Sequence, residues 1–362
     1  MRPLNIIRDL SKVADLIELC FAPTMDNEGQ RYLSDMRRAS RDDGFLGWAN
    51  HMAESTSLPL TGYVWEQDGR IIGNASLIPF RDKGKRIYLI ANVAVHPDHR
   101  GRGIGQALTR LSMQHAFGRK GTAVWLHVRE DNPSAIKLYT NLGFREIARR
   151  TSWQANPTSL SPQPSPALAL GASVVSAQGE SDIQIVPRHA RFWPLQQDWL
   201  RRLYPNALGW YHLWNFNALR PGLMNWLYLV FVDMNVKQWA AVRNDELLAT
   251  LTWMPQGSRS ESMFAATGPA LPKEHRDDVS GVSRVAEGIH LHLPQVQVSR
   301  PDETLALSGD EASEALTQLL IHARRALPNH STLSLDYPAG EMTDAISAAG
   351  FKPRRTLIWM RA

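Results

Sequence analysis

The feature that most constrains the fold of this chain is a stretch that divides its 362 residues into two parts of similar length. Residues 154–182 are rich in Pro, Ser, Ala and Gly, and they carry almost no charge before Glu180. Such a composition is typical of a linker between domains. Because the chain is also too long for one ordinary domain, we predict a first domain over residues 1–153, a linker over 154–180 and a second domain over 181–362.

The first part alternates helix-like and strand-like patterns, which predicts an α/β domain. Apolar residues recur at helical spacing over residues 11–21, and two strand-like runs flank the turn formed by Asp68 and Gly69. Further along, we expect a strand over residues 86–95, a helix over 103–121, a strand over 123–130, a helix over 132–144 and a strand over 145–153.

The second part repeats this order of elements. Residues 238–255 contain two strand-like runs around a polar turn, as residues 62–80 do. Residues 344–362 likewise repeat the helix-then-strand pattern of residues 135–155. Repetition on this scale predicts a duplicated fold.

The composition excludes several classes of protein. The single cysteine, Cys20, cannot form an intramolecular disulfide or a cysteine metal cluster, and its apolar helical surroundings favour a place in the core. The net charge of +5 comes without a run of Lys and Arg of the kind that binds nucleic acid. No segment reaches transmembrane length, and the first residues lack the apolar block of a signal peptide. We therefore expect a cytoplasmic protein that binds neither nucleic acid nor a membrane.

The stretch VAVHPDHRGRGIGQAL, residues 93–108, passes from a strand through a glycine-rich turn into a helix. Glycines let the backbone approach a ligand closely, and the free N–H groups at the start of a helix attract an anion such as phosphate. Arg100 and Arg102 add positive charge. The dinucleotide-binding pattern fails because Leu108 stands where it requires Gly, and the P-loop pattern fails because no Lys-Ser/Thr pair follows. These residues predict a phosphate site without identifying its ligand.

This loop resembles the acetyl-coenzyme A loop of the GCN5-related N-acetyltransferases, the GNAT superfamily. The superfamily pattern, Q/R-x-x-G-x-G/A, is matched by Arg100, Gly103 and Gly105. The next strand and helix of the superfamily are also matched, at Leu126, Val128, Asn132, Ala135, Tyr139, Gly143 and Phe144. The resemblance implies two tandem GNAT-like domains, each with a mixed, mostly antiparallel central sheet flanked by helices.

The resemblance also implies an enzyme that moves an acetyl group from acetyl-CoA to a primary amine by direct attack, without a metal. The acceptor would be a small-molecule amine or a peptide N-terminus, and the protein a monomer or homodimer. A backbone N–H near Val93 would polarise the thioester carbonyl, and Asn132 is an expected helix cap as well. The implied coenzyme-binding residues are Val93, Ala94, Val95, Arg100, Gly101, Arg102, Gly103, Ile104, Gly105, Asn132 and Tyr139.

Two residues are the candidates for catalysis. Tyr139 occupies the position at which superfamily members with Tyr protonate the departing sulfur of coenzyme A. His127 lies where several relatives have a carboxylate base, and the pKa of histidine suits that role. A purely structural His127 is an equal alternative. Glu130, Glu28 or bulk water would then take the proton from the amine.

The second domain departs from the superfamily pattern. No Q/R-x-x-G-x-G/A loop occurs over residues 269–288, and Ile346 stands at the position of Tyr139. We therefore predict a degenerate, non-catalytic copy. Its many aromatic residues between Trp193 and Trp253 either pack the core, which we favour, or shape an acceptor cleft. A sensor that binds acetyl-CoA without turnover is the alternative function, although sensing would not need an acid at the sulfur.

Overall fold

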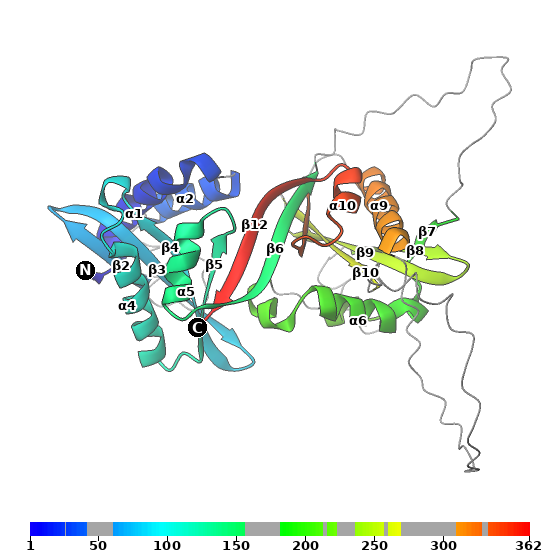
Figure 1. Cartoon of the computed structure of the whole chain (residues 1–362), viewed down its shortest axis with the longest axis horizontal. Coiled ribbons are helices and arrows are strands. Elements are labelled where there is room, and N and C mark those ends of the chain that lie inside the picture. Colours follow the sequence, from blue (N-terminus) through cyan, green and yellow to red (C-terminus); the bar gives the residue numbers. More distant parts are fainter. Residues whose placement is uncertain are drawn as a thin grey trace, which may run out of the picture. The chain divides into compact units, whose positions relative to one another are not determined.

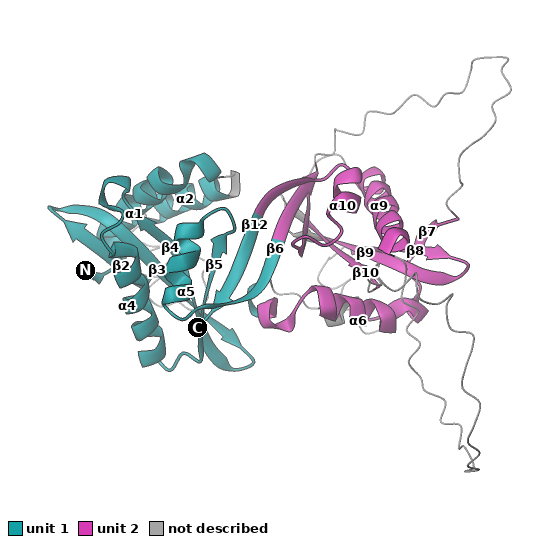
Figure 2. Ribbon diagram, in the orientation of Figure 1, with its two compact units in different colours: residues 1–150, 210–213, 356–362 teal, residues 151–209, 214–355 magenta. Residues whose placement is uncertain are grey.

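The computed structural model describes residues 1–25, 27–41, 61–155, 182–212, 216–222, 236–256, 260–268, 309–327 and 332–362. They form two compact units (Figures 1 and 2). Unit 1 consists of Met1–Arg150, Trp210–Leu213 and Thr356–Ala362, and unit 2 of Thr151–Gly209 and Trp214–Arg355.

Unit 1 is built on a sheet with the strand order β1-β2-β3-β4-β5-β12. Neighbouring strands are antiparallel except β4 and β5, which run parallel. Because parallel neighbours need a crossover connection, a helix joins them, α4 (Ile104–Gly118). The strands are β1 (Arg2–Pro3), β2 (Thr61–Gln67), β3 (Arg70–Asp82), β4 (Lys85–Val95), β5 (Ala123–Arg129) and β12 (Lys352–Arg361). The mixed, mostly antiparallel sheet that the sequence predicts is therefore confirmed in unit 1.

Helices cover both faces of this sheet. α1 (Ile6–Phe21) and α2 (Asn27–Ala39) pack in one apolar cluster with Ile71, whereas α4 and α5 (Pro133–Asn141) pack in another with Ile72. Adjacent residues of a strand point to opposite faces of a sheet. The two helix pairs therefore lie on opposite sides of β3, and the sheet between them is buried on both faces.

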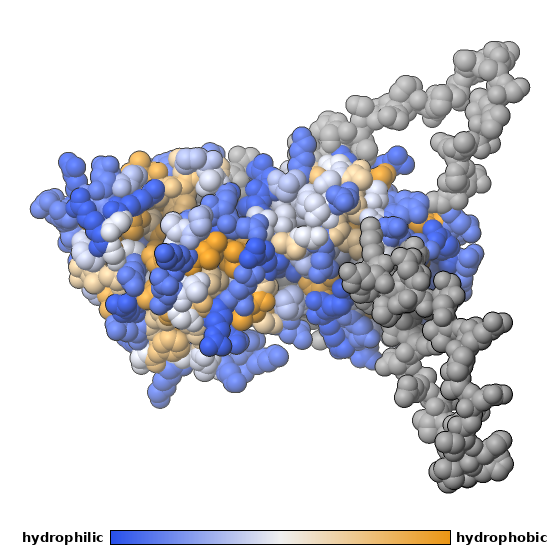
Figure 3. Space-filling view, in the orientation of Figure 1, coloured by the Kyte–Doolittle hydropathy of each residue, from blue (hydrophilic) through white to orange (hydrophobic). Residues whose placement is uncertain are grey.

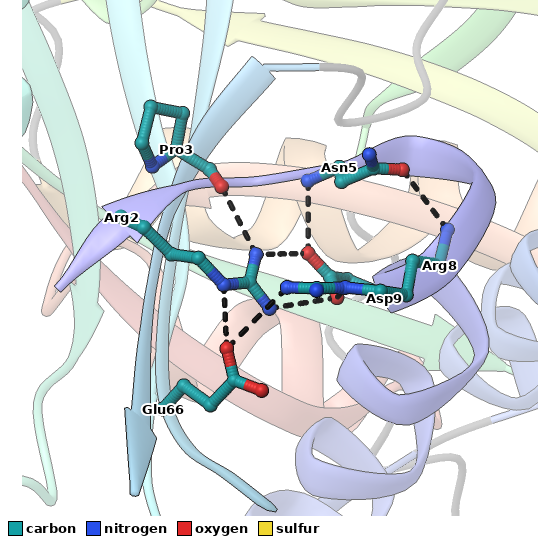
Figure 4. A network of polar contacts seen from close by, with 6 residues as sticks. All are labelled: Arg2, Pro3, Asn5, Arg8, Asp9 and Glu66. Atoms are coloured by element: carbon teal, nitrogen blue, oxygen red, sulfur yellow. Dashed lines mark hydrogen bonds and ion pairs between the residues drawn. The ribbon is translucent and has the colours of Figure 1, made fainter. Parts of the chain in front are cut away.

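A network of charges holds the N-terminal strand (Figure 4). Arg2 donates to Glu66 at 2.6 Å and to both carboxylate oxygens of Asp9 at 2.5 and 2.9 Å. The backbone N–H of Asn5 and the side chain of Arg8 also donate to Asp9, at 2.9 and 3.1 Å. Burial alone would raise the pKa of Asp9, but these hydrogen bonds outweigh it and lower that pKa. The fully buried carboxylate is therefore ionised.

Unit 2 repeats the strand order of unit 1, as β7-β8-β9-β10-β11-β6. Its strands are β7 (Gln184–Pro187), β8 (Lys237–Arg243), β9 (Glu246–Gln256), β10 (Ser260–Thr267), β11 (Leu333–Pro338) and β6 (Arg145–Ala155). Here too the fourth and fifth strands, β10 and β11, are parallel. The helices that pack on them are α6 (Trp193–Leu203), α9 (Gly309–Ala326) and α10 (Thr343–Ala348). The repeated order of elements in the sequence thus corresponds to a repeated architecture.

The last strand of each unit comes from the other half of the sequence. β6 carries Trp153 and Ala155 into the core of unit 2, although we expected it to end the first domain. β12 carries Ile358 and Met360 into the core of unit 1 and pairs with β5. The predicted division at residue 153 stays a prediction about domains, and nearly all of the predicted linker lies outside the described residues.

Hydrophilic residues cover most of the visible described surface, and hydrophobic ones show between them near α5 (Figure 3). Of the helices that the structure describes, none has the length and apolar character needed to cross a bilayer. In the same described ranges, no three His, Cys, Asp or Glu side chains gather as metal ligands.

Candidate active site

The glycine-rich loop connects β4 to α4, as predicted. Pro97–His99 form a single turn of 3-10 helix, after which Arg100 is extended. Gly101 and Gly103 have φ angles of 76° and 74°, in the left-handed region where other side chains are strained. Gly103 is the N-cap residue of α4. Since the first amides of a helix have no acceptor within it, this loop presents several N–H groups to a ligand.

These amides border a cavity of about 730 Å³ in unit 1. Its wall is formed by the end of α1, the end of β4, the loop, the start of α4 and one side of α5. Every predicted coenzyme-binding residue lines the cavity except Arg102, which donates to the carbonyl of Asp98 at 3.4 Å. Stretches far apart in the sequence therefore meet at one site.

Positive charge lies on two sides of the cavity. Arg100 donates from Nε to the carbonyl of Val95 at 3.2 Å, which holds its guanidinium at the wall. Lys137, on α5, is a second cation in the wall. Arg129 also lines the cavity but forms an ion pair with Asp131 at 2.6 Å, which offsets its charge. Lys137 is not among the residues predicted from the sequence, although the helical pattern after Asn132 puts it on the exposed side of its helix.

β4 and β5 diverge beside the cavity. Within the described part of unit 1, their parallel pairing joins Ile87–Leu89 to Ala123–Trp125 and stops there, although β4 continues to Val95 and β5 to Arg129. The unpaired end of β4 supplies Val93, Ala94 and Val95 to the cavity wall. An extended ligand in this gap can therefore reach backbone N–H and C=O groups that another strand would otherwise occupy.

Tyr139 projects from α5 into the same wall. Its ring meets Phe144 edge-on at 6.0 Å between centroids and packs in a cluster with Leu126 and Val128 of β5. The residue is 7% exposed, and burial raises its pKa to about 12. The phenol therefore stays protonated at neutral pH and is available as a hydrogen-bond or proton donor.

Two other wall residues have a clear local role. The side-chain oxygen of Asn132 accepts hydrogen bonds from the N–H of Ala135 at 3.2 Å and the hydroxyl of Ser134 at 2.9 Å, which confirms the predicted helix cap. Its contact with a coenzyme stays a prediction. Cys20 is half-buried and lines the cavity, rather than lying in the core as expected. Its thiol donates to the carbonyl of Val95 at 3.3 Å, and burial raises the pKa of that thiol.

His127 lies outside the cavity, on the other face of β5 from Tyr139. Its ring packs 4.9 Å from that of Trp359 on β12, between centroids, and 6.4 Å from that of Tyr211 on α7 (Gly209–His212). The neighbouring Leu126 faces Tyr139 instead, as the alternation of a strand requires. The structure therefore separates the two catalytic candidates by the thickness of the sheet, and the role of His127 stays a prediction.

The alternative bases are no better placed. Glu130 accepts a short hydrogen bond from Arg149, which also pairs with Glu146 at 3.0 Å. The side chain of Glu28 lies outside the described residues.

In unit 2, the corresponding gap between strands is occupied by the unit's own side chains. β10 pairs with β11 from Glu261 to Met263, and both strands then continue beyond the paired residues. The hydroxyl of Tyr204, which follows α6, contacts both the N–H and the C=O of Ala265 at 3.2 Å. Arg202 donates to the carbonyl of Thr267 at 2.8 Å. Backbone groups two residues apart point to the same edge of a strand, so these side chains satisfy consecutive groups along one edge of β10.

Other features of unit 2 also differ from unit 1. α9 carries Asp310 and Glu311 in its first turn, where negative charge opposes the binding of an anion. Ile346, at the position of Tyr139, is fully buried in the core. The region without a glycine loop, residues 269–288, lies outside the described residues.

The aromatic residues of the second half take different places. The core of unit 2 contains Trp193, Trp199 and Trp253, as we favoured. Trp210 and Tyr211 instead belong to unit 1. Trp214, Trp226 and Tyr228 lie outside the described side chains.

Comparison with known proteins identifies the class. Residues 23–144 match the model of the acetyltransferase (GNAT) family, a span that includes the loop, the diverging strands and Tyr139. Residues 23–144 therefore match a GNAT domain, in agreement with the motifs between residues 93 and 144.

Its relatives include acetyltransferases with different acceptors. A mycothiol acetyltransferase of Thermomonospora curvata is 35% identical over 95 residues, which cover 26% of this chain and 31% of the relative. The ribosomal protein bS18-alanine N-acetyltransferase of Escherichia coli is 39% identical over 62 residues, 17% of this chain and 42% of the relative. The chain thus matches less than half the length of either. A solved tandem GNAT protein from the clavulanic acid biosynthesis pathway is 16% identical over 99% of this chain and 97% of that one, with a TM-score of 0.43.

Proposed function

We propose that this protein is an N-acetyltransferase that moves an acetyl group from acetyl-CoA to a primary amine, with its donor site in the cavity of unit 1. The observation that carries the proposal is the meeting of three features at one cavity. These are the exposed amides before α4, the unpaired end of β4 and the buried phenol of Tyr139.

The wall of the cavity suits the chemistry of acetyl-CoA. The amides of Ile104 and Gly105, together with Arg100 and Lys137, would hold the pyrophosphate. The edge of β4 at Val93–Val95 that does not pair with β5 would bind the amide groups of the pantetheine arm, as a neighbouring strand would. This arrangement would bring the thioester to Tyr139, at the far side of the gap.

The transfer itself needs few protein groups. The amine nitrogen attacks the thioester carbonyl carbon, and the carbon–sulfur bond breaks as the new amide forms. The departing thiolate takes the proton of the Tyr139 hydroxyl, which regains one from solvent afterwards. The proton of the amine leaves through water to His127 or to the bulk. Burial raises the pKa of the phenol, and a thiolate buried beside it would become a stronger base for the same reason.

The acceptor is a primary amine on a small molecule or at a peptide N-terminus. One relative is named for mycothiol and the other for an alanine of a ribosomal protein. We propose further that the protein works in the cytoplasm as a monomer or homodimer. No described residue outside the donor cavity identifies the acceptor.

We also propose that unit 2 is a degenerate copy without a donor site. The hydroxyl of Tyr204 and the guanidinium of Arg202 already satisfy the edge of β10 that a pantetheine arm would use. The acidic first turn of α9 would repel a pyrophosphate. The chain would therefore bind one coenzyme molecule.

Calorimetric titration with acetyl-CoA tests both proposals. We expect binding at one site per chain, lost in the variant Arg100→Ala/Gly103→Ala because it removes a cation and strains the left-handed N-cap. Arg110→Ala is the matched control, since Arg110 is an exposed arginine on the same helix outside the cavity. Two sites per chain would contradict the degenerate copy, and an absence of binding would overturn the acetyltransferase assignment.

A sensor that binds acetyl-CoA without turnover is the second candidate. A screen of primary amines with acetyl-CoA, in which the release of free thiol is measured, distinguishes such a sensor from an enzyme. Acetyl transfer to any amine, at a rate that falls in the Tyr139→Phe variant, would favour the enzyme.

A further inference from the structure

A bulge interrupts β4 within the end that does not pair with β5. Ala91 pairs with Ser76 and Ala94 with Asn74, so two residues of β4, Asn92 and Val93, stand opposite one residue of β3. Such a bulge leaves the extra residue outside the ladder of hydrogen bonds and redirects its backbone groups. Asn92 has a φ angle of 52°, in the left-handed region that a residue other than glycine rarely adopts.

A buried side chain holds the bulge from β3. Asn74 is fully buried, and its Nδ2 donates to the carbonyl of Asn92 at 2.9 Å and to the hydroxyl of Ser76 at 3.2 Å. The carbonyl of Asn92 only accepts, which fixes the orientation of the Asn74 amide. Its Oδ1 has no hydrogen-bond partner among the described residues. A buried, unsatisfied oxygen lowers the stability of the fold. The hydrogen bond from Asn74 to the carbonyl of Asn92 would explain why an asparagine is nevertheless present here.

A second side chain holds the bulge from α2. The hydroxyl of Tyr32 accepts a hydrogen bond from Nδ2 of Asn92 at 2.7 Å, and its ring packs in the apolar cluster between α1 and α2. Burial is the main reason that the pKa of Tyr32 is raised to about 12. The hydroxyl is therefore a neutral acceptor throughout the physiological range. Asn92 is thus held at its backbone by one element and at its side chain by another.

We propose that Asn92, Asn74 and Tyr32 are positioning residues, which fix the bulge so that the backbone N–H of Val93 faces the thioester carbonyl of acetyl-CoA. Val93 lines the donor cavity directly after Asn92. A donor in an oxyanion site stabilises the transition state only when its direction is set in advance. This inference rests on the proposed function, because it needs a thioester in the cavity.

Carbonyl-labelled acetyl-CoA bound to the full chain gives a direct readout. A hydrogen bond to the carbonyl moves its 13C resonance downfield, and calorimetry with acetyl-CoA and with coenzyme A measures binding separately. We expect Tyr32→Phe and Asn92→Ala to lose most of the downfield shift while the affinity for coenzyme A stays unchanged, because the loop and α4 are intact. Turnover with any acceptor should fall by up to about 100-fold.

Two further variants sharpen this test. Asn92→Gly keeps the left-handed backbone but loses the bond to Tyr32, so it should retain more of the shift than Asn92→Ala. Tyr63→Phe is the matched control for losing a tyrosine hydroxyl, since the hydroxyl of Tyr63 contacts Nδ1 of His115 on α4 at 2.8 Å rather than Asn92. Tyr32→Phe keeps the ring and hence the packing, so it tests the inference even if Asn92→Ala fails to fold.

The outcomes separate this inference from the proposed function. An unchanged carbonyl shift in both Tyr32→Phe and Asn92→Ala, with normal binding of acetyl-CoA, would overturn the positioning role alone. Equal weakening of coenzyme A and acetyl-CoA would also overturn it, because it would indicate a general structural role. If the unaltered protein binds no acetyl-CoA, the proposed function fails and this inference falls with it.

Discussion

Tyr139 is a buried residue in the wall of the unit 1 cavity. Replacing it with Phe removes one oxygen and keeps the ring against Phe144. We expect turnover to fall by about 10²–10⁴-fold, the usual contribution of a general acid, with the affinity for acetyl-CoA unchanged. Steady-state rates and calorimetry on the two proteins check this, and a variant with normal turnover would remove Tyr139 from the mechanism.

The pH dependence of turnover provides a separate check on the same residue. Because burial raises the pKa of Tyr139 to about 12 from an ordinary value of 10.0, its ionisation should not lower the rate up to pH 10. A raised pKa in the folded state also means that the associated stability is present below pH 10 and lost as the pH approaches 12. A loss of rate below pH 10 that disappears in Tyr139→Phe would contradict this expectation.

Asp9 makes the N-terminal network a test of stability (Figure 4). Asp9→Asn would leave Arg2 without its buried counter-charge, and we expect a loss of about 3 kcal/mol in the free energy of unfolding. The folded state lowers the pKa of Asp9, so this stability is present above its ordinary pKa of 3.8 and is lost as the pH falls through the lowered value.

Urea unfolding across a range of pH measures this effect. The difference between the unaltered protein and Asp9→Asn should be largest at neutral pH and should shrink in acid. Asp35→Asn is the control, because Asp35 is an exposed carboxylate on α2. A difference that does not depend on pH would indicate that packing, rather than charge, is what the substitution disturbs.

Residues whose role follows from local backbone geometry were the ones that the sequence predicted well. The glycines of the loop, the cap at Asn132 and the wall position of Tyr139 all belong to one continuous motif. The bonds of Asn92 to Asn74 and Tyr32 join segments far apart in the chain, and no local pattern indicates them. That His127 and Tyr139 lie on opposite faces of the sheet becomes evident only when α5 is packed on β5.

At the level of elements, β12 is the part of unit 1 that can be tested most directly. Trp359 is 2% exposed and contacts the rings of His127 and Tyr211. We expect Trp359→Ala to cost about 3–5 kcal/mol in the free energy of unfolding, as large core truncations do.

The same substitution should loosen the pairing of β12 with β5. Hydrogen exchange at the amides of Trp125–Arg129 should therefore become faster in Trp359→Ala, because those residues pair with Leu357–Arg361. Trp239→Ala is the control, since that tryptophan packs against the core of unit 2. Unchanged protection along β5 would mean that β12 contributes little to the sheet of unit 1.

Strand types followed from the sequence, but strand partners did not. The alternating patterns of residues 145–153 and 354–361 predict two strands equally well. Which of the two strands lies beside β5 depends on packing across the whole fold. The alternating pattern of a single strand does not identify its partner. The exchange of β6 and β12 is therefore a property that only the structure reveals.

At the level of the whole molecule, the two units share one strand order and differ in how the gap between the parallel strands is used. The repeat in the sequence predicted the shared architecture, because hydrophobic patterns survive long divergence. It also predicted a degenerate second copy from the loss of single residues, and this stays a prediction. It did not indicate that Tyr204 and Arg202 would occupy the edge of β10, since those contacts join a helix to a distant strand.

The exchanged strands also set the order in which the molecule can be made. Almost all of unit 2 lies between β5 and β12 along the chain, so β5 has β4 but not β12 beside it while the ribosome is still producing unit 2. Domains usually fold as they emerge, from the N-terminus onward. In this protein unit 1 reaches its complete sheet only after unit 2 has been translated, and a chain that stalls in between would carry the whole glycine-rich loop on an unfinished sheet.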